Sequence, residues 1–285
     1  MNRPISLAAL TVLELSPPDM VTCAAEAGYS HVGIRLIPAT PTEPQHELVG
    51  DTPLLREVLA RLADTGVQVL DAEIFRIKPD TRVAEYEAAV ATAARLGARE
   101  LLVAGNDPDE ARLCDTFAAF CELAARYRLG ANLEFMPWTD AKDLNQAARI
   151  VAHAATHASE AGAAHAGVLI DAFHLSRSRS RIADIAQIPP QRLRYLQLCD
   201  VPAKQPPDMD AILAEARAER LFPGEGGLDL VALLRAVPAD IPLSIEVPTH
   251  TLARTVGATE RARRALAATR RVLAKVDAKD EVQQA

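Results

Sequence analysis

Short apolar runs alternate along the whole chain with longer stretches in which apolar residues recur every three or four positions. The short runs predict buried strands, and the longer stretches predict amphipathic helices. Strands are expected at residues 5–10, 31–36, 67–75, 100–105, 131–136, 167–173, 193–199 and 242–247. Helical stretches such as 52–66 and 85–97 lie between them, and each of these two ends on a glycine, which is typical of a helix C-cap.

Eight strand–helix units without a break in composition predict a parallel sheet closed into a single (β/α)8 TIM barrel. The competing architecture is a doubly wound open sheet, which favours a glycine-rich phosphate-binding turn after its first strand. Residues 10–18 read LTVLELSPP and contain no glycine. We therefore expect one α/β barrel over residues 1–277 and a polar, frayed C-terminal tail over residues 278–285.

Composition and charge narrow the class of protein. The 285 residues are 49% apolar and 24% charged, which suits a soluble globular chain with a substantial core. The net charge of −7 argues against a non-specific nucleic-acid binder, which needs clustered Lys and Arg. Because no segment approaches roughly 18 uninterrupted apolar residues, no membrane span is expected. The N-terminus lacks the features of a secretory signal, and four cysteines without a CxxC pair indicate a cytoplasmic protein.

Two connections are longer than the others and follow strands two and seven. Residues 37–51 are rich in proline, and residues 201–227 contain a short helical pattern of their own. In a barrel both connections lie on the C-terminal face, where substrate sites are built. The 201–227 segment is therefore expected to form either a lid or a subunit contact.

Four consecutive strands carry an oxygen-bearing side chain near their C-terminal ends: Glu134, Asp171, Gln197 and Glu246. Closure of a barrel brings neighbouring strand ends within side-chain reach. Three carboxylates in one pocket repel one another unless a cation is present, and a buried amide needs a partner. We therefore predict a divalent metal bound by these four side chains. The all-oxygen set favours Mn²⁺ or Mg²⁺, with Co²⁺ and Zn²⁺ as further candidates.

The earlier strand ends supply candidate substrate-binding residues: Arg35, Glu73, Arg76 and Asn106. An arginine at this position suits a carboxylate or a phosphate on the substrate. The alternative is a structural ion pair among the two arginines and the glutamate. His153 and His157 have a metal-compatible spacing, but their helix is expected on the barrel exterior without a third ligand, so we assign no site to them.

The order of Glu, Asp-x-x-His, Gln and Glu on strands five to eight resembles the xylose isomerase-like barrel family, often called sugar phosphate isomerases/epimerases. The segments LEFMPW, IDAFHL, LQLCD, PGEG and IEVP carry this resemblance, which covers about residues 5–275. It implies the same four metal ligands, contact of His174 with a substrate oxygen, and places for Arg220 and Glu225 in the substrate pocket. Gln197 stands where sugar epimerases usually have histidine, and in this the chain is similar to bacterial 3-dehydroshikimate dehydratases of the same superfamily.

These residues permit a reaction that begins with loss of the proton next to a carbonyl group. Glu134 and Glu246 are candidate bases, and His174 can stabilise an oxyanion or protonate a departing hydroxyl. The predicted function is a metal-dependent isomerase/epimerase of carbohydrate metabolism acting on a small polyhydroxylated or keto-carbocyclic substrate. The alternative is a 3-dehydroshikimate dehydratase-like lyase that acts on a keto-carbocyclic acid.

Two other classes can be compared with this prediction. An abasic-site endonuclease on the same barrel needs additional histidine ligands and a basic face, and the chain has neither. A non-catalytic sugar-binding barrel is expected to have lost strand-end ligands, whereas all four positions hold oxygen donors here. The expected partner is therefore a small molecule, with no nucleic acid and no membrane, and a homo-oligomer is left open.

Overall fold

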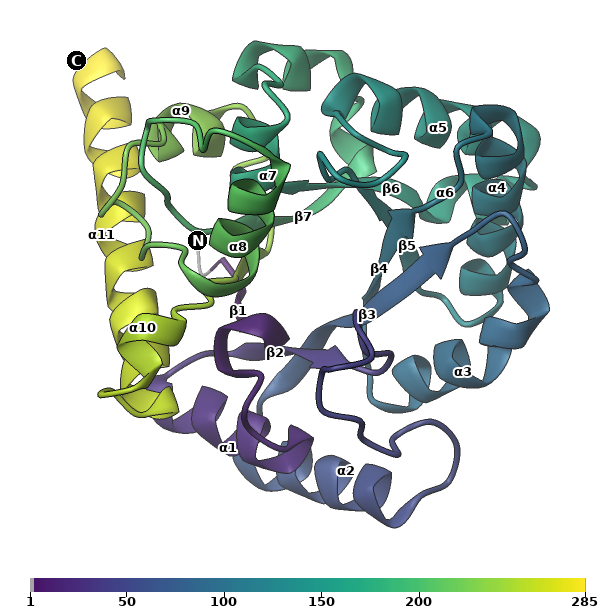
Figure 1. Cartoon of the computed structure of the whole chain (residues 1–285), viewed down its shortest axis with the longest axis horizontal. Coiled ribbons are helices and arrows are strands. Elements are labelled where there is room, and N and C mark those ends of the chain that lie inside the picture. The colour runs from purple at the N-terminus through teal and green to yellow at the C-terminus, as the bar shows by residue number, and fades with distance from the viewer. Residues whose placement is uncertain (1–2, 285) are drawn as a thin grey trace.

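The computed structural model describes the backbone of residues 3–284 and the side chains of residues 3–278. Within these residues, eight parallel strands form a closed barrel in which each strand pairs with the next and β8 pairs with β1 (Figure 1). The predicted (β/α)8 barrel is thus confirmed. The strands are β1 (Ile5–Leu7), β2 (His31–Arg35), β3 (Gln68–Ile77), β4 (Glu100–Gly105), β5 (Gly130–Glu134), β6 (Ala166–Asp171), β7 (Leu193–Leu198) and β8 (Leu243–Ile245).

Helices surround the barrel, as the view down its axis shows (Figure 1). They are α1 (Pro17–Ala27), α2 (Pro53–Thr65), α3 (Glu87–Arg95), α4 (Glu110–Arg126), α5 (Leu144–His157), α6 (Glu160–His165), α7 (Ala172–Arg177), α8 (Met209–Ala218), α9 (Leu230–Arg235), α10 (His250–Ala253) and α11 (Ala258–Gln284). Helix α2 illustrates the local rules: Thr52 caps its start, and Gly66 ends it in the left-handed conformation at φ 72°. The helical stretch expected over 52–66 therefore folds as its sequence predicts.

Several element boundaries differ from the sequence expectation. The first strand ends at Leu7, because residues 9–12 turn into a 3-10 helix. Strand β6 ends at Asp171, whose Oδ1 accepts a hydrogen bond from the His174 backbone N–H and so begins α7. At the C-terminus, α11 runs through residue 284, so the boundary expected at 277 falls inside a helix, and residue 285 lies outside the described residues.

The core has two parts that follow from strand alternation. The larger part packs strands against helices and includes Leu7, Val32, Phe117 and Leu133, all with no exposed surface. The smaller part joins side chains of β3 to β7 inside the barrel: Leu70, Ile74, Leu102, Ala104, Met136, Leu169 and Tyr195. Each fully buried leucine contributes about 1.5–3 kcal/mol to folding. Buried polar side chains lie at both ends of the barrel: Glu100, at the start of β4, accepts hydrogen bonds from Asn132 and Arg194, and the candidate site lies at the C-terminal end.

The long 201–227 connection folds back over the C-terminal face and is fixed at both ends. The buried Arg177 of α7 pairs with Glu215 of α8 at 2.7 Å. Asp200, which closes the seventh strand, accepts backbone N–H groups of Val201, Gly224 and Leu228. Asp200 therefore has a structural role in holding the returning segment. None of the helices described between residues 3 and 284 combines the length and apolar character that crossing a lipid bilayer requires.

Candidate active site

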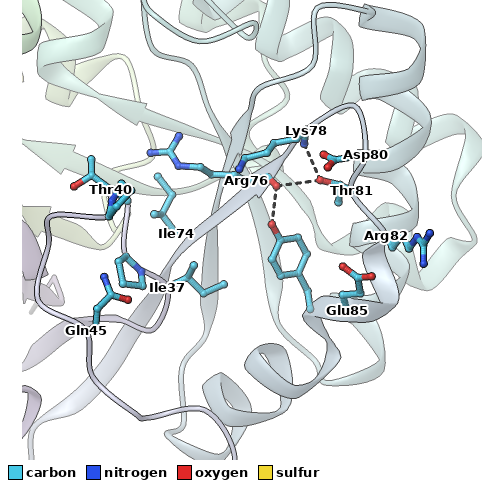
Figure 2. A pocket seen from close by; sticks show the side chains of 14 residues that line it. Ile37, Thr40, Gln45, Ile74, Arg76, Lys78, Asp80, Thr81, Arg82 and Glu85 are labelled. Atoms are coloured by element: carbon cyan, nitrogen blue, oxygen red, sulfur yellow. Dashed lines mark hydrogen bonds between the residues drawn. The ribbon is translucent and has the colours of Figure 1, made fainter.

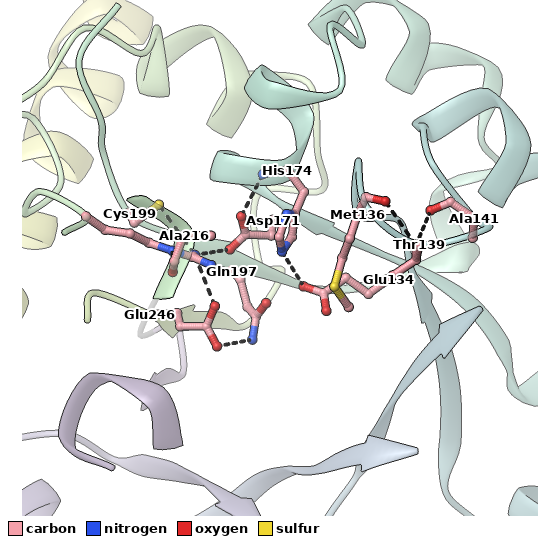
Figure 3. Close-up of polar contacts among 11 residues, drawn as sticks. Glu134, Met136, Thr139, Ala141, Asp171, His174, Gln197, Cys199, Ala216 and Glu246 are labelled. Carbon is pink, nitrogen blue, oxygen red and sulfur yellow. Dashed lines mark hydrogen bonds and ion pairs between the residues drawn. The ribbon is translucent and has the colours of Figure 1, made fainter. Parts of the chain in front are cut away.

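The four predicted metal ligands lie at neighbouring strand ends (Figure 3). Glu134 ends β5, Asp171 ends β6, Gln197 lies within β7, and Glu246 directly follows β8. All four are buried, and Asp171 pairs with Gln197 in the register of β6 and β7. The Gln197 Nε2 lies 3.5 Å from Glu246 Oε1. Barrel closure therefore brings these residues to one end of the barrel, as the sequence pattern predicts.

A guanidinium group stands between two of the carboxylates. The Nη1 of Arg220 lies 2.9 Å from Asp171 Oδ2 and 3.0 Å from Glu246 Oε2. Its Nε donates to the Ala216 carbonyl, and its guanidinium carbon Cζ lies 4.7 Å from the Phe173 ring centroid. The sequence analysis expected a metal alone to neutralise the carboxylates. The structure shows that Arg220 already neutralises part of their negative charge.

Main-chain pairing explains how Arg220 reaches this position. Asp200 and Leu221 form an isolated antiparallel bridge, and the Arg220 N–H donates to the Pro248 carbonyl. The returning segment is therefore clamped between the chain ends that follow β7 and β8. Residue 220 lies beside the carboxylates of β6 and β8, although it is 49 residues from Asp171 in sequence.

Burial makes negative charge costly at this end of the barrel. It raises the pKa of Glu134 well above the ordinary carboxyl range, and the neighbouring Glu246 and Asp171 add to the rise. It also raises the pKa of Glu246 to about 7, although Arg220 opposes the shift. One guanidinium thus leaves the carboxylate cluster short of positive charge.

Two buried oxygen atoms support the fit of a further cation. Gln197 Oε1 and Glu134 Oε1 have no hydrogen-bond partner among the described residues. Unpaired buried oxygens and a donor set of carboxylates and an amide suit a hard divalent cation. No group of three or more His, Cys, Asp or Glu side chains within the described part of the chain is arranged as a metal-holding cluster. The four ligands therefore remain a prediction that the donor chemistry fits.

His174 lies next to Glu134, where α7 begins. Its Nε2 is 3.5 Å from Glu134 Oε1, and its ring packs edge-on against Trp138 at 5.0 Å between centroids. Burial lowers the pKa of His174 to about 4, and Arg220 adds to this effect while Asp171 opposes it. The imidazole is therefore neutral at neutral pH and can hold an added proton only transiently.

A small cavity opens onto these groups from the C-terminal face. Glu134, Glu246, His174 and Arg220 line it, whereas Asp171 and Gln197 are not among its lining residues. Ile74, Leu102, Met136 and Trp138 contribute apolar walls. The cavity thus combines a carboxylate, a neutral imidazole and a shielded surface, which suits proton transfer to and from a small substrate.

The candidate substrate residues on the early strands separate into two kinds. Arg35 pairs with Glu73 at 3.2 Å and with Glu43 at 3.1 Å, which is the structural ion pair considered as an alternative. Arg76 takes no part in that pair, and its Nη1 donates to Asn106 Oδ1 at 3.0 Å. Arg76 lines the cavity, whereas Asn106, which accepts the hydrogen bond from Arg76, does not. A groove next to the cavity, bounded by the 37–45 loop and residues 78–86, is shown in Figure 2.

Other predicted residues lie elsewhere. Glu225 is half-exposed and lies 3.5 Å from Arg271 on α11, and it does not line the cavity. His153 stacks on His157 and lies 2.9 Å from Asp115, away from the barrel mouth. The structure therefore brings Arg220 to the site and leaves Glu225 outside it.

The cavity residues that sequence reasoning missed include Glu43, Trp138 and Arg217. Trp138 belongs to the segment LEFMPW, so its position directly after a strand end was an available signal. Glu43 and Arg217 lie in the two long connections, where periodicity does not indicate which side chains turn inward. Their placement depends on how those connections fold over the barrel.

Comparisons with known proteins agree with the barrel fold. A family model described as "Xylose isomerase-like TIM barrel" matches residues 21–272. The 3-dehydroshikimate dehydratase of Pseudomonas aeruginosa is 27% identical over 246 residues, which is 81% of this chain. The chain spans only 36% of the length of that relative.

Solved structures share the fold. A xylose isomerase-like TIM barrel/4-hydroxyphenylpyruvate dioxygenase fusion protein matches with a TM-score of 0.80 and 22% identity, over 100% of this chain and 45% of its own. The IOLI protein, solved with a zinc atom, matches with a TM-score of 0.74 and 18% identity over 96% of this chain and 99% of its own. An L-ribulose 3-epimerase matches with a TM-score of 0.70 and 17% identity over 100% and 99%. At these identities the likeness concerns the fold alone.

Proposed function

The chain belongs to the xylose isomerase-like TIM barrel family, and from this premise we propose that it is a divalent-metal-dependent lyase that removes water from a small hydroxy-ketone. The observation that carries this proposal is an asymmetry between two carboxylates. Glu246 is ion-paired with Arg220 at 3.0 Å, whereas Glu134 faces the neutral His174. One free base beside one proton carrier suits elimination, which needs no second base on the other face of the substrate.

Glu134, Asp171, Gln197 and Glu246 are the residues that would hold the metal. When bound, a divalent cation would polarise the substrate carbonyl and stabilise the negative charge that develops on its oxygen. Mn²⁺ and Mg²⁺ fit the oxygen donors, and the zinc atom in the IOLI structure keeps Zn²⁺ among the candidates.

The proton steps belong to the side chains. Glu134 removes the proton from the carbon next to the carbonyl, and the electron pair of that C–H bond moves toward the carbonyl oxygen. The enolate then expels hydroxide from the next carbon as the new C=C bond forms. His174 Nε2, which lies 3.5 Å from Glu134, takes the proton from it and delivers it to the departing hydroxide, giving water.

Epimerisation, the reaction placed first by sequence reasoning, is the second candidate. It is supported by one observation: Glu246 lines the same cavity as Glu134 and could return a proton to the other face. This role requires Glu246 to exchange its contact with Arg220 for a proton. The ion pair therefore ranks epimerisation behind elimination.

Incubation of the purified chain with Mn²⁺ and 3-dehydroshikimate tests the proposal. We expect protocatechuate to form, and its ultraviolet absorbance provides the assay. A chelator should stop product formation, and the E134Q variant should form product far more slowly. If instead the protein exchanges deuterium from D2O into ketoses and leaves 3-dehydroshikimate unchanged, the epimerase assignment replaces the lyase.

A further inference from the structure

We propose that the cavity binds the carboxylate of its substrate between Arg76, at the end of β3, and Arg217, in the last turn of α8. Both residues line the cavity that holds Glu134, His174 and Glu246. This inference rests on the proposed function only in placing the substrate in this cavity. The substrate class is a carboxylate, and an epimerase could also act on a carboxylate substrate. Arg217 comes from the long connection, so the site joins the barrel to the segment that covers it.

Arg76 has a fixed backbone and an uncommitted charge. Its carbonyl oxygen accepts a hydrogen bond from the Tyr86 hydroxyl at 2.7 Å. It also accepts one from the Thr81 hydroxyl at 3.3 Å (Figure 2). Its guanidinium donates only to the Asn106 side-chain oxygen, which is uncharged. No ion pair of Arg76 exists among the described side chains, so donors of the guanidinium remain for a ligand in the cavity.

Other arginines at this end of the barrel are paired with carboxylates. Arg35 is matched by Glu73 and Glu43, and Arg220 by Asp171 and Glu246. Among the described residues, the guanidinium of Arg217, a residue of α8, has neither a hydrogen-bond partner nor an ion pair. Arginine pairing has thus used every carboxylate that lines the cavity except Glu134, and it has left two guanidinium groups there.

The two unpaired charges act on each other. Burial lowers the pKa of Arg76, with Arg35 and Arg217 adding to the effect, while Glu134 and Glu43 oppose it without forming an ion pair. Positive charges that share a rim repel, and an anion placed between them removes this repulsion. The surroundings of Arg76 therefore favour a negatively charged ligand.

A carboxylate fits better than a phosphate. Phosphate sites commonly use backbone N–H groups of a glycine-rich turn or a helix N-terminus. The cavity lining contains no glycine in the described part of the chain, and α8 contributes residues 216 and 217 from its C-terminal end. That end of a helix carries partial negative charge, so recognition depends on the side chains alone. The planar guanidinium matches a planar carboxylate through two parallel hydrogen bonds.

Protocatechuate and catechol form a matched pair of probes, because they share the ring and both hydroxyls and differ only in the carboxylate. We expect the chain with Mn²⁺ to bind protocatechuate about tenfold or more tightly than catechol by titration calorimetry. R76Q should bring this ratio close to one, and R217Q should reduce it. R82Q removes an exposed charge of the neighbouring groove that does not line the cavity, so the ratio should stay unchanged.

Equal binding of the two probes by the unmodified chain would overturn the proposal, as would an unchanged ratio in folded R76Q and R217Q. Because Arg217 is exposed, R217Q provides a test even where R76Q disturbs folding. Stronger displacement of protocatechuate by inorganic phosphate than by acetate would reassign the rim to a phosphate. A retained preference for protocatechuate without turnover of 3-dehydroshikimate would refute the proposed lyase and support this site.

Discussion

Glu134 and Glu246 face one cavity from two sides, yet their surroundings differ (Figure 3). Glu246 shares Arg220 with Asp171, so its negative charge is matched inside the protein. Glu134 has a neutral imidazole as its neighbour, and one of its oxygens has no hydrogen-bond partner among the described residues. Two glutamates at neighbouring strand ends thus differ in their partners: Glu246 contacts an arginine, and Glu134 contacts a histidine.

This difference teaches that the neighbour, and not the residue type, decides the role of a buried carboxylate. Burial raises the pKa of both glutamates. At Glu246 the next-largest influence is Arg220, which lowers the pKa. At Glu134 the neighbouring Glu246 and Asp171 raise the pKa further, and their influence is larger than that of Arg220. Arg220 therefore favours the charged form of Glu246, and Glu134 has no arginine partner that does the same for it. Substitutions at Arg220, Glu134 and Glu246 should therefore have different effects on stability and turnover.

Removal of the shared cation should have the largest effect on stability. R220M leaves Asp171 and Glu246 buried without their partner, so we expect the free energy of unfolding to fall by about 3–5 kcal/mol. Urea denaturation of the metal-free protein measures this loss. Mn²⁺ should recover more stability in R220M than in the unmodified chain, since a second cation can supply the missing charge. Equal stabilisation by Mn²⁺ would indicate that the metal and Arg220 do not act on the same carboxylates.

Loss of the free base should have the largest effect on turnover. E134Q keeps the shape of the side chain but accepts no proton, so we expect the rate of protocatechuate formation to fall by about 10²–10⁴-fold. Initial rates with Mn²⁺ at saturating 3-dehydroshikimate measure it. H174N should fall within the same range, because both residues handle one proton. A slow E134Q beside a fully active H174N would remove the imidazole from the proton path.

The two amide substitutions should separate the sides by stability. E246Q leaves Arg220 with Asp171 as its remaining carboxylate, so a loss of about 1–3 kcal/mol is expected. E134Q removes no arginine partner, and its stability should stay within about 1 kcal/mol of the unmodified chain. Both values come from the same denaturant titration at neutral pH. Similar losses for the two variants would show that the environments are equivalent.

A change of stability with pH is expected as well. Burial raises the pKa of Glu246 to about 7, so the folded metal-free chain holds a proton that the unfolded chain releases above the ordinary carboxyl range. Stability from this proton is full below the ordinary value and is lost as the pH rises toward 7. The slope should be at most about 1.4 kcal/mol per pH unit for this group. E246Q should flatten it, and an unchanged slope would place the titration elsewhere.

The sequence by itself determined the eight strands, the barrel and the four strand-end oxygens at Glu134, Asp171, Gln197 and Glu246. These depend on local periodicity and on the rule that parallel strands of a closed barrel end at one face. The ends of β1 and β6 shifted because short helices begin there, and Asp171 shows why: its side chain caps α7. Local sequence therefore defines which element forms more closely than where it stops.

Only the tertiary structure decided which charges meet. Arg220 reaches Asp171 and Glu246 because the 201–227 segment returns across the barrel, and Glu225 of the same segment turns toward α11 instead. Glu43 and Glu73 both form ion pairs with Arg35, and Arg76 has no carboxylate ion-pair partner among the described residues. Side-chain pairing depends on through-space distance and burial, which no pattern along the chain contains. The positions of the oxygens were thus readable from the sequence, whereas their partners were set by how the long connections fold.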